Sequence, residues 1–565
     1  MSGPAELVMA ALLGGLLLAL NAINILHRRF DSDEMGHLHI VWSWTHGFVQ
    51  YRDVFDNHMP LFHLLFAPVL ALIGDRATIL YWMRLILLPM YFVTAWCTYA
   101  IATRLFSRRA GAWSVLALGF YASYHLVAFE FRTDNLWTPL WLLCVTSLLT
   151  RAITVRRSLV AGVLLGFCFA VSMKSTIFLL SLAISFPLAI ALVRTRNAGQ
   201  ERIYFARCAA TFLAGSILVP GTIAVFFAVK GVWRDFRYGV LDFNFLADQI
   251  YKNQLLYNRH PVLALVVLVS TLAAAIYIGQ RIVSACGDRD VAFRRTFVFF
   301  ICVFYIAFFK ILWPPISRSY SGFYPLASAL LVGGIFAASR RLDAYGWKFK
   351  PILRPATLLP CIVLAEMVFL LSLHPIRKNG TQEETRLLRN VLALTEPTDY
   401  VFDCKGETVF RPRCFRPILE AITIRAIRRG IMVDDAPERC IGTHTCVVAT
   451  MLGKRFSSST RQFVLHNYLP VAKDLRVAGM VLHASPQDPH RLNFQVVVPA
   501  DYEIMEADRT VSGTLDGSPY QGARFLSAGP HSFESESGSD DLILLWAKAI
   551  DRHFPCLATR SSPHG

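Results

Sequence analysis

ELVMAALLGGLLLALNAINIL, residues 6–26, is an apolar stretch about as long as a helix that crosses the hydrocarbon core of a membrane. It is too long, and has too few basic residues before it, for a cleaved signal peptide, so it predicts a first transmembrane helix. Apolar blocks of similar length recur along the chain, which is 55% hydrophobic with a mean hydropathy of +0.45. Soluble globular domains are less apolar than this. The sequence therefore predicts a polytopic α-helical membrane protein.

About eleven spans are predicted from the apolar blocks. They cover residues 6–26, 81–103, 110–128, 135–150, 157–172, 175–193, 208–229, 261–279, 296–312, 323–338 and 352–373. Alternate connections between them are short and rich in Arg and Lys, which gather on the cytoplasmic side of membranes. This bias predicts that the amino terminus lies inside and that the chain after the last span lies outside. It also explains the net charge of +17 without a nucleic-acid partner.

One apolar segment, residues 60–74 (PLFHLLFAPVLALIG), is not counted as a span. It is short and contains two prolines, and counting it would reverse the charge bias of every later loop. We predict an interfacial or re-entrant helix there. It belongs to an outer loop with interfacial helices over about residues 27–80.

The last third of the chain is less apolar and more charged, which predicts a transmembrane domain over residues 1–374 and an extracytoplasmic domain over 375–565. Helix-like and strand-like segments in mixed order predict an α/β portion over about residues 375–474. Alternating segments such as FQVVVPADYEIM predict a β-rich portion over about residues 475–565. The cysteines of this domain are Cys404, Cys414, Cys440, Cys446 and Cys556. Their pairing stays open, with Cys404–Cys414 and Cys440–Cys446 as two local options in an oxidising compartment.

Ionisable and aromatic residues reach the predicted outer face from four separate segments. These are SDE (32–34), FEFRTDNLW (129–137), the surroundings of Lys174 and SRSYSGFYPL (317–326). Charges near hydrocarbon are costly and tend to be paired or to line a polar path. Helix capping or snorkelling explains any one of them. Their convergence on one face predicts a functional site.

These segments resemble a known superfamily. SDEMGHLHIVWSWTHG (32–47), YRDVFDNHMPLFHLL (51–65) and MRLI (83–86) are similar to the first outer loop of the glycosyltransferase C enzymes. The closest likeness is to the protein O-mannosyltransferase branch that includes the lipid A aminoarabinose transferases. The segment FRTDNL resembles the second outer loop of these enzymes. The segment SRSYSGFYPL resembles their late Arg/Tyr segment, and Lys174 matches a lysine that often follows their fifth span. The resemblance covers residues 1 to about 340.

The resemblance implies an integral membrane glycosyltransferase that moves a sugar from a polyprenyl phosphate donor to an acceptor outside the membrane. A hydroxyl acceptor needs a base. Asp33 is expected to be that base, with Glu34 orienting it or contacting substrate, in one displacement that inverts the sugar carbon. Cations are expected to bind the donor phosphate. The expected substrate-binding residues are His58, Arg132, Asp134, Lys174, Arg318, Tyr320 and Tyr324.

The chain departs from the aminoarabinose enzymes at residues 57–60, where Asn-His-Met-Pro stands in place of Glu-Lys-Pro-Pro, so that His58 replaces a phosphate-binding lysine. No cofactor is assigned, and a divalent metal at the site stays open. The sugar also stays open, as does the acceptor, whether glycan, lipid or protein. The resemblance implies a bacterial inner membrane with the C-terminal domain on the periplasmic side.

The alternative function is a transporter or flippase of lipid-linked sugars without transferase activity. Such proteins usually carry an internal repeat and polar groups near the middle of the bilayer. We find no repeat between the halves of the chain, and the charges gather at one face. These two features favour the transferase.

Overall fold

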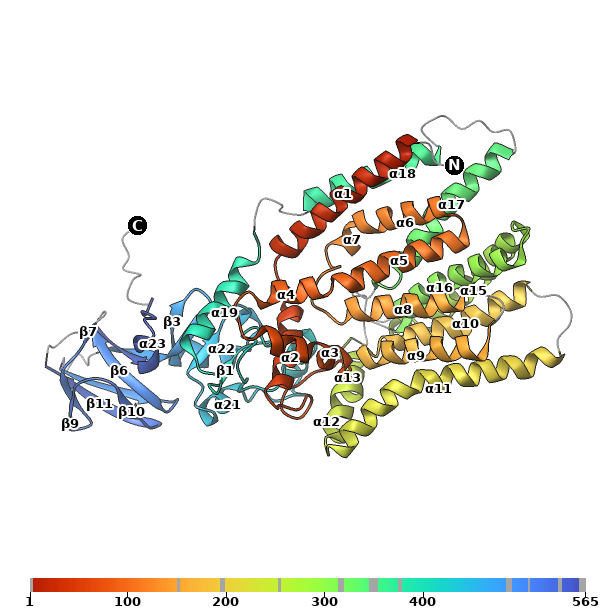
Figure 1. Ribbon diagram of the computed structural model, residues 1–565. Coiled ribbons are helices and arrows are strands. Elements are labelled where there is room, and N and C mark those ends of the chain that lie inside the picture. Colours follow the sequence, from red (N-terminus) through yellow and green to blue (C-terminus); the bar gives the residue numbers. More distant parts are fainter. Residues whose placement is uncertain are drawn as a thin grey trace. The chain divides into compact units, whose positions relative to one another are not determined.

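The structure is a computed structural model that describes residues 4–149, 153–193, 199–251, 256–312, 320–344, 354–373, 379–483, 490–506, 509–536 and 541–557. The chain forms two compact units (Figure 1). The first unit contains residues 1–30, 57–66 and 80–381, and the second contains 31–56, 67–79 and 382–565. Two pieces of the predicted outer loop therefore fold with the C-terminal third. The predicted division between residues 374 and 375 remains a proposal.

The first unit is helical. Its helices are α1 (Pro4–His27), α4 (Ile79–Ile86), α5 (Leu88–Leu105), α6 (Arg108–Phe120), α7 (Ala122–His125), α8 (Asp134–Leu148), α9 (Val155–Val171), α10 (Ser175–Val193), α11 (Gly199–Val229), α12 (Trp233–Arg237), α13 (Phe243–Tyr251), α14 (Leu256–Arg259), α15 (Pro261–Ser284), α16 (Arg289–Leu312), α17 (Tyr324–Ala344) and α18 (Pro355–Leu373). Each predicted span coincides with one or two of these helices. Among the described residues, seven helical stretches are long and apolar enough to cross a membrane, so the predicted number of eleven is not confirmed. The protein is a multi-pass membrane protein.

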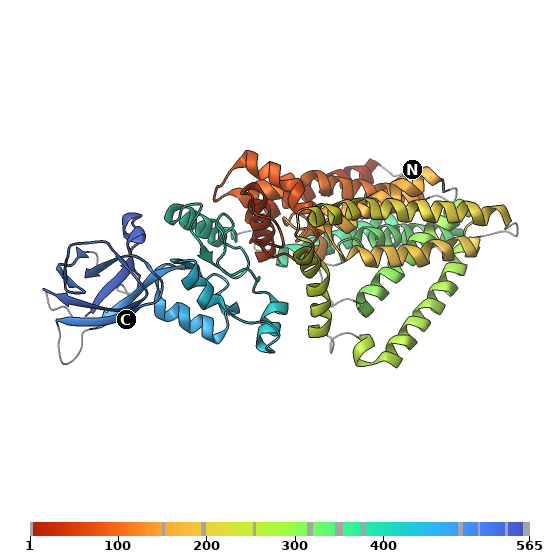
Figure 2. The same cartoon turned by 90° about the horizontal axis from the view of Figure 1, so that it is seen from below.

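Glycines allow the helices of this unit to pack closely. Gly162 and Gly166 form a G-x-x-x-G pair on α9, and both face the backbone of α11. A Cβ atom at Gly162 would lie 2.2 Å from the carbonyl oxygen of Phe212. Small residues at this spacing let two membrane helices approach each other. Accordingly, α9 and α11 run side by side (Figure 2).

The amino-terminal helix packs into the same bundle. Leu13 and Leu17 of α1 share a core with Trp113 of α6 and Leu359 of α18, and α1 and α18 lie side by side in Figure 1. At one end of α1, Glu6 forms an ion pair with Arg109 at 2.5 Å. These contacts tie the first and last predicted spans together. The segment predicted to be an interfacial or re-entrant helix forms α3 (Leu61–Ile73), which contains Pro68.

The second unit combines helices with two sheets. Its helices are α2 (Ser32–Thr45), α19 (Gln382–Leu394), α20 (Ala421–Arg428), α21 (Ala436–Gly442), α22 (Ser458–Asn467) and α23 (Ala547–Asp551). Its strands are β1 (Val401–Phe402), β2 (Val447–Ala449), β3 (Tyr468–Ala472), β4 (Leu475–His483), β5 (Arg491–Val496), β6 (Ala500–Glu506), β7 (Arg509–Thr510), β8 (Gly513–Leu515), β9 (Ser518–Tyr520), β10 (Arg524–Leu526), β11 (Gly529–Ser535) and β12 (Asp541–Trp546). The predicted sheet-rich C-terminal region is confirmed.

The larger sheet of the described residues has the order β1-β2-β4-β12-β6-β10, with β3 paired to β4 and β7 to β6. Among the described strands of this sheet, β1 and β2 pair in parallel and the other pairs are antiparallel. A second sheet has the order β5-β11-β8-β9. The turn between β8 and β9 is Asp516-Gly517, and both residues have positive φ, as a two-residue hairpin turn requires. Loop 403–409, in the connection between β1 and β2, contains Lys405, whose contacts are described below.

Candidate functional site

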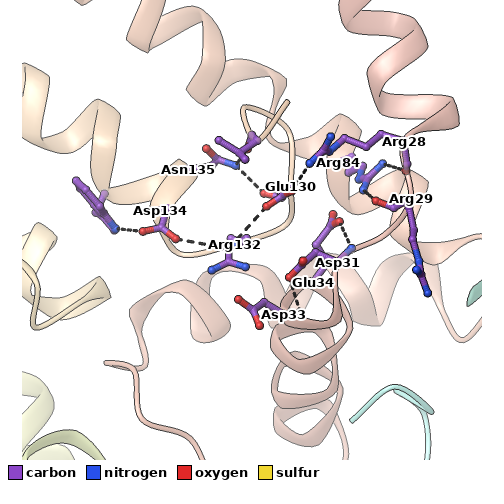
Figure 3. A network of polar contacts seen from close by, with 12 residues as sticks. Arg28, Arg29, Asp31, Asp33, Glu34, Arg84, Glu130, Arg132, Asp134 and Asn135 are labelled. Carbon is purple, nitrogen blue, oxygen red and sulfur yellow. Dashed lines mark hydrogen bonds and ion pairs between the residues drawn. The ribbon is translucent and has the colours of Figure 1, made fainter. Parts of the chain in front are cut away.

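A chain of alternating charges is centred on the loop before α8 and on the first residue of that helix (Figure 3). Arg28 contacts Glu130 at 3.4 Å, Glu130 contacts Arg132 at 3.9 Å, and Arg132 contacts Asp134 at 3.5 Å. Lys174 then donates to Asp134 at 3.2 Å. We call these five residues the charge ladder. Three cations face two carboxylates, so the ladder has one positive charge in excess and suits a bound anion.

The backbone around the ladder is held by side chains. Asn135 donates to the carbonyl oxygens of Val127 and Glu130 at 2.8 and 2.7 Å, which closes the loop before α8 (Figure 3). Asp134 is the first residue of α8, where the helix dipole favours a negative charge. Its carboxylate also accepts a hydrogen bond from the Trp137 ring nitrogen at 3.1 Å. The Asp134 carboxylate is therefore fixed, and it fixes the two cations beside it.

Other predicted residues of the first unit gather around the same carboxylate. Lys174, Arg132 and His58 all act on Asp134 electrostatically. Tyr305, which was not predicted, interacts with Asp134 and with both Tyr320 and Tyr324. The rings of Tyr320 and Tyr324 are 6.4 Å apart between centroids. Six of the seven predicted substrate-binding residues, Asp134 included, are thus brought together, while Arg318 lies outside the described residues.

Segment 233–251 approaches His58 from another part of the first unit. Asn244 donates to the carbonyl oxygen of Asn57 at 3.1 Å, directly before His58 in the chain. The segment contains a π-helix over Tyr238–Asp242, an irregular form that is frequent at functional sites. The contact fixes the backbone that presents His58.

Arg84 organises the end of α1. Its guanidinium donates to the carbonyl oxygens of Ile25, Arg28 and Arg29 at 3.2, 2.8 and 3.1 Å. It also lies over the Phe30 ring, 4.3 Å from its centroid. The last residues before Asp31 are therefore held firmly within the first unit. Sequence resemblance pointed to Arg84, but not to this role.

The SDE segment begins α2 in the second unit, and its carboxylates have different surroundings. Asp31 caps the helix by accepting a hydrogen bond from the Asp33 amide at 3.0 Å. Glu34 is fully buried and accepts one from the Asp31 amide at 2.9 Å. This reciprocal arrangement is a capping box. The Asp33 side chain is 23% exposed, so it is the more accessible of the two predicted catalytic carboxylates.

Lys405 contacts Asp33 from the C-terminal part of the second unit. Its ammonium group forms an ion pair with Asp33 and lies 3.6 Å from a carboxylate oxygen of Glu420. Sequence reasoning missed both residues. The pairing joins positions 372 residues apart, so no local pattern could have indicated it.

Neither of the two suggested local disulfides is formed, because all twelve cysteines are free thiols. Cys414 and Cys440 lie beside each other instead, with their sulfur atoms 3.3 Å apart. No group of three or more His, Cys, Asp or Glu side chains in the described part of the chain is arranged to hold a metal ion.

Comparison with known proteins agrees with this architecture. Residues 57–219 match the family model described as dolichyl-phosphate-mannose-protein mannosyltransferase. This partial family match and the fold that the chain shares with ArnT both agree with the predicted resemblance to the glycosyltransferase C superfamily. The predicted resemblance is confirmed.

Two crystal structures of ArnT from Cupriavidus metallidurans are among the similar structures. The one bound to undecaprenyl phosphate has a TM-score of 0.53 and 12% identity, over 83% of this chain and 97% of ArnT. The apo structure has a TM-score of 0.54 and 11% identity, over 84% of this chain and 98% of ArnT. The apo oligosaccharyltransferase of Archaeoglobus fulgidus has a TM-score of 0.48 and 12% identity, over 86% and 73% of the two chains. No curated protein matches the sequence.

Proposed function

We propose that the protein is a membrane glycosyltransferase that moves a sugar from a polyprenyl phosphate to a hydroxyl acceptor outside the membrane. The observation that carries the proposal is the charge ladder, whose excess positive charge and rigid loop suit a phosphate group. The family match over residues 57–219 and the shared fold with an enzyme crystallised with undecaprenyl phosphate support it.

The donor phosphate binds to Arg132 and Lys174. Both side chains are mostly buried, with 10% and 14% of their surface exposed, so water screens their charges little. Arg offers two parallel donors to phosphate oxygens, whereas Lys acts as a point charge. These cations stabilise the charge that develops on the phosphate as it leaves the sugar. His58 adds a third nitrogen ligand, and Tyr320 and Tyr324 border the site. Arg318 is included as a donor-binding residue on the sequence resemblance alone.

Asp33 acts as the base. It accepts the proton of the acceptor hydroxyl while the hydroxyl oxygen bonds to the anomeric carbon and the carbon–phosphate oxygen bond breaks. This single displacement inverts the sugar carbon. Glu34 holds the first turn of α2 in shape through the capping box.

We place the second unit on the outer side of a bacterial inner membrane, in accord with the basic connections between spans. The acceptor is a glycan, a lipid or a protein of the cell envelope. The competing function, a flippase, needs no base and no acceptor. The two functions therefore differ in whether a new glycosidic bond forms.

A transfer assay with the purified full-length protein tests the proposal. Undecaprenyl phosphate carrying a radiolabelled hexose or pentose is supplied in nanodiscs together with an extract of cell-envelope glycans, lipids and proteins. We expect label to move to the extract and undecaprenyl phosphate to be released, with neither event in Asp33→Asn. Movement of label across proteoliposome membranes without any new glycosidic bond would establish the flippase instead.

A further inference from the structure

Loop 403–409 of the second unit is a preformed turn that presents Lys405. The buried Asp403 carboxylate accepts hydrogen bonds from the amides of Gly406 and Thr408 at 2.8 and 3.0 Å, and from Arg413 at 2.6 Å. The buried Glu407 carboxylate accepts from the amides of Cys404 and Lys405 at 3.1 and 2.7 Å. Two carboxylates thus hold the backbone of the loop from its interior. The position of the Lys405 backbone is therefore held by contacts that do not involve Asp33.

The same loop packs against the face of α2 that carries Asp33. A Cβ atom at Gly36 would lie 3.0 Å from the Lys405 carbonyl oxygen, and Gly36 follows Asp33 by one helical turn. One turn further, the His39 ring nitrogen Nδ1 pairs with the Val409 carbonyl oxygen at 2.8 Å. Gly406 has a φ of +85°, and a Cβ atom there would lie 2.8 Å from the Cβ of His39. Three successive turns of α2 are therefore fitted to this loop.

The ammonium group of Lys405 lies at the end of this contact. Its side chain is 12% exposed, against 23% for Asp33 and 21% for Glu420. A cation beside a partly buried carboxylate favours the ionised form of that carboxylate and limits its rotation. Glu420 holds the ammonium group from a second direction. Arg455, which contacts the Ser32 hydroxyl at 3.4 Å, brings a further positive charge to the same turn.

We propose that Lys405 is a positioning residue for the base Asp33, which it keeps ionised and correctly oriented. This proposal rests on the proposed function. It gives the C-terminal unit a direct role in the reaction, because loop 403–409 completes the surroundings of a carboxylate that belongs to the amino-terminal part of the chain. Lys405 itself touches no substrate in this scheme.

The test is the pH dependence of kcat for Lys405→Met, which removes the charge but keeps most of the side-chain length. In the described part of the second unit, the charged groups near Asp33 include Lys405, Glu420, Arg455 and the two capping carboxylates on its own turn. Without the ammonium group, Asp33 holds its proton more tightly, so we expect the acidic limb of the profile to move up by about one pH unit. At acidic pH, where kcat of both proteins is falling, kcat of Lys405→Met should be about tenfold below that of the wild type. The KM for the donor should stay within twofold of the wild-type value. Lys405→Arg restores the limb.

Lys473 provides a matched control. It forms an ion pair with Glu383 at 2.6 Å on an exposed part of the same unit, with 63% of its side chain exposed. Lys473→Met should leave the profile unchanged. A Lys405→Met profile that keeps the wild-type limb would overturn the positioning role, even if the overall rate falls. A wild-type protein that forms no glycosidic bond would instead refute the proposed function, so the two failures are distinguishable.

A second inference comes from a separate place in the same unit, the buried pair Cys414 and Cys440. Their sulfur atoms are 3.3 Å apart, although the residues are 26 positions apart in the chain. We infer that these two thiols form a disulfide when the unit folds in an oxidising compartment. Both thiols lose their protons and an S–S bond forms. The disulfide of a thiol oxidant takes up the two electrons and becomes two thiols.

Peptide mapping of protein purified from membranes, alkylated without reductant, tests this pairing. We expect one cross-link between Cys414 and Cys440, with Cys404 and Cys446 alkylated. In Cys414→Ser, Cys440 should become alkylated too. Complete alkylation of Cys414 and Cys440 in the native protein would overturn the inference, as would a cross-link between Cys404 and Cys414.

Discussion

The charge ladder of the first unit and the first turn of α2 in the second unit use carboxylates in opposite ways. In the ladder, Glu130 and Asp134 lie between cations and hold them in place. In α2, two carboxylates cap the helix and the third, Asp33, is held by a cation. The residue types in a charged cluster therefore do not tell which of its members contact the substrate. In the ladder the carboxylates are structural and the cations meet the substrate, whereas in α2 the cation is structural and the carboxylate Asp33 meets the substrate.

The largest effect should come from Asp33, the partly buried carboxylate of α2 that we propose as the base. Asp33→Asn keeps the shape of the side chain but removes the base, so turnover should fall by roughly 10² or more. Asp31→Asn is the matched control, because Asn caps helices about as well as Asp. Initial rates of sugar transfer for both variants check this contrast. Equal losses in the two variants would mean that the turn as a whole matters and that Asp33 has no special role.

A smaller effect is expected at the end of the charge ladder. Lys174→Gln removes a charge-assisted contact to the phosphate, which typically costs about 1.5–3 kcal/mol, or roughly ten- to a hundredfold in donor affinity. Lys230→Gln, at an exposed lysine of the same unit, should change nothing. The KM for the donor measures the difference, with the amount of folded protein in the membrane as a control. An unchanged KM in Lys174→Gln would assign this lysine to the ladder's structure only.

The smallest effect concerns the loop that presents Lys405. Burial and the nearby Asp403 charge raise the pKa of Glu407 to about 7, against 4.5 for an ordinary Glu side chain. Between these values the folded state keeps the proton and the unfolded state releases it. The group therefore costs stability as pH rises from about 4.5 to 7, and this cost is complete above pH 7.

Glu407→Gln should remove that dependence. The melting temperature of the wild type, relative to this variant, should fall by a few degrees between pH 5 and pH 8. Burial lowers the pKa of His39 to about 4, so His39 acts in the opposite direction as pH falls from 6.5 to 4. His39 is present in both proteins, so its contribution largely cancels in the difference. A constant difference across this range would show that Glu407 is ionised throughout.

The parts of this account that sequence could predict are those with local signals. Apolar length and alternating basic loops located the helices, and strand-like alternation located β5 and β6. The acids and bases near Asp134 were found because each stands beside an apolar block. The capping box was also readable, since Asp31 and Glu34 have the required spacing.

Contacts between distant segments had no such signal. Lys405 lies in a stretch, DCKGET, whose charges look like those of any surface loop. Its ion pair with Asp33 depends on how α2 packs against that loop. The neighbouring sulfur atoms of Cys414 and Cys440 depend in the same way on the fold around β1 and β2. Local spacing favoured two other pairs, which the fold does not form.

The most direct test of the central claim, that one region binds the phosphate and the other performs proton transfer, is the affinity for undecaprenyl phosphate. Its Kd should be measured side by side for the wild type, Asp33→Asn and Arg132→Gln in nanodiscs. The account predicts that Asp33→Asn binds within about twofold of the wild type despite its lost turnover, and that Arg132→Gln binds roughly ten- to a hundredfold more weakly. Weakened binding in Asp33→Asn together with unchanged binding in Arg132→Gln would contradict it.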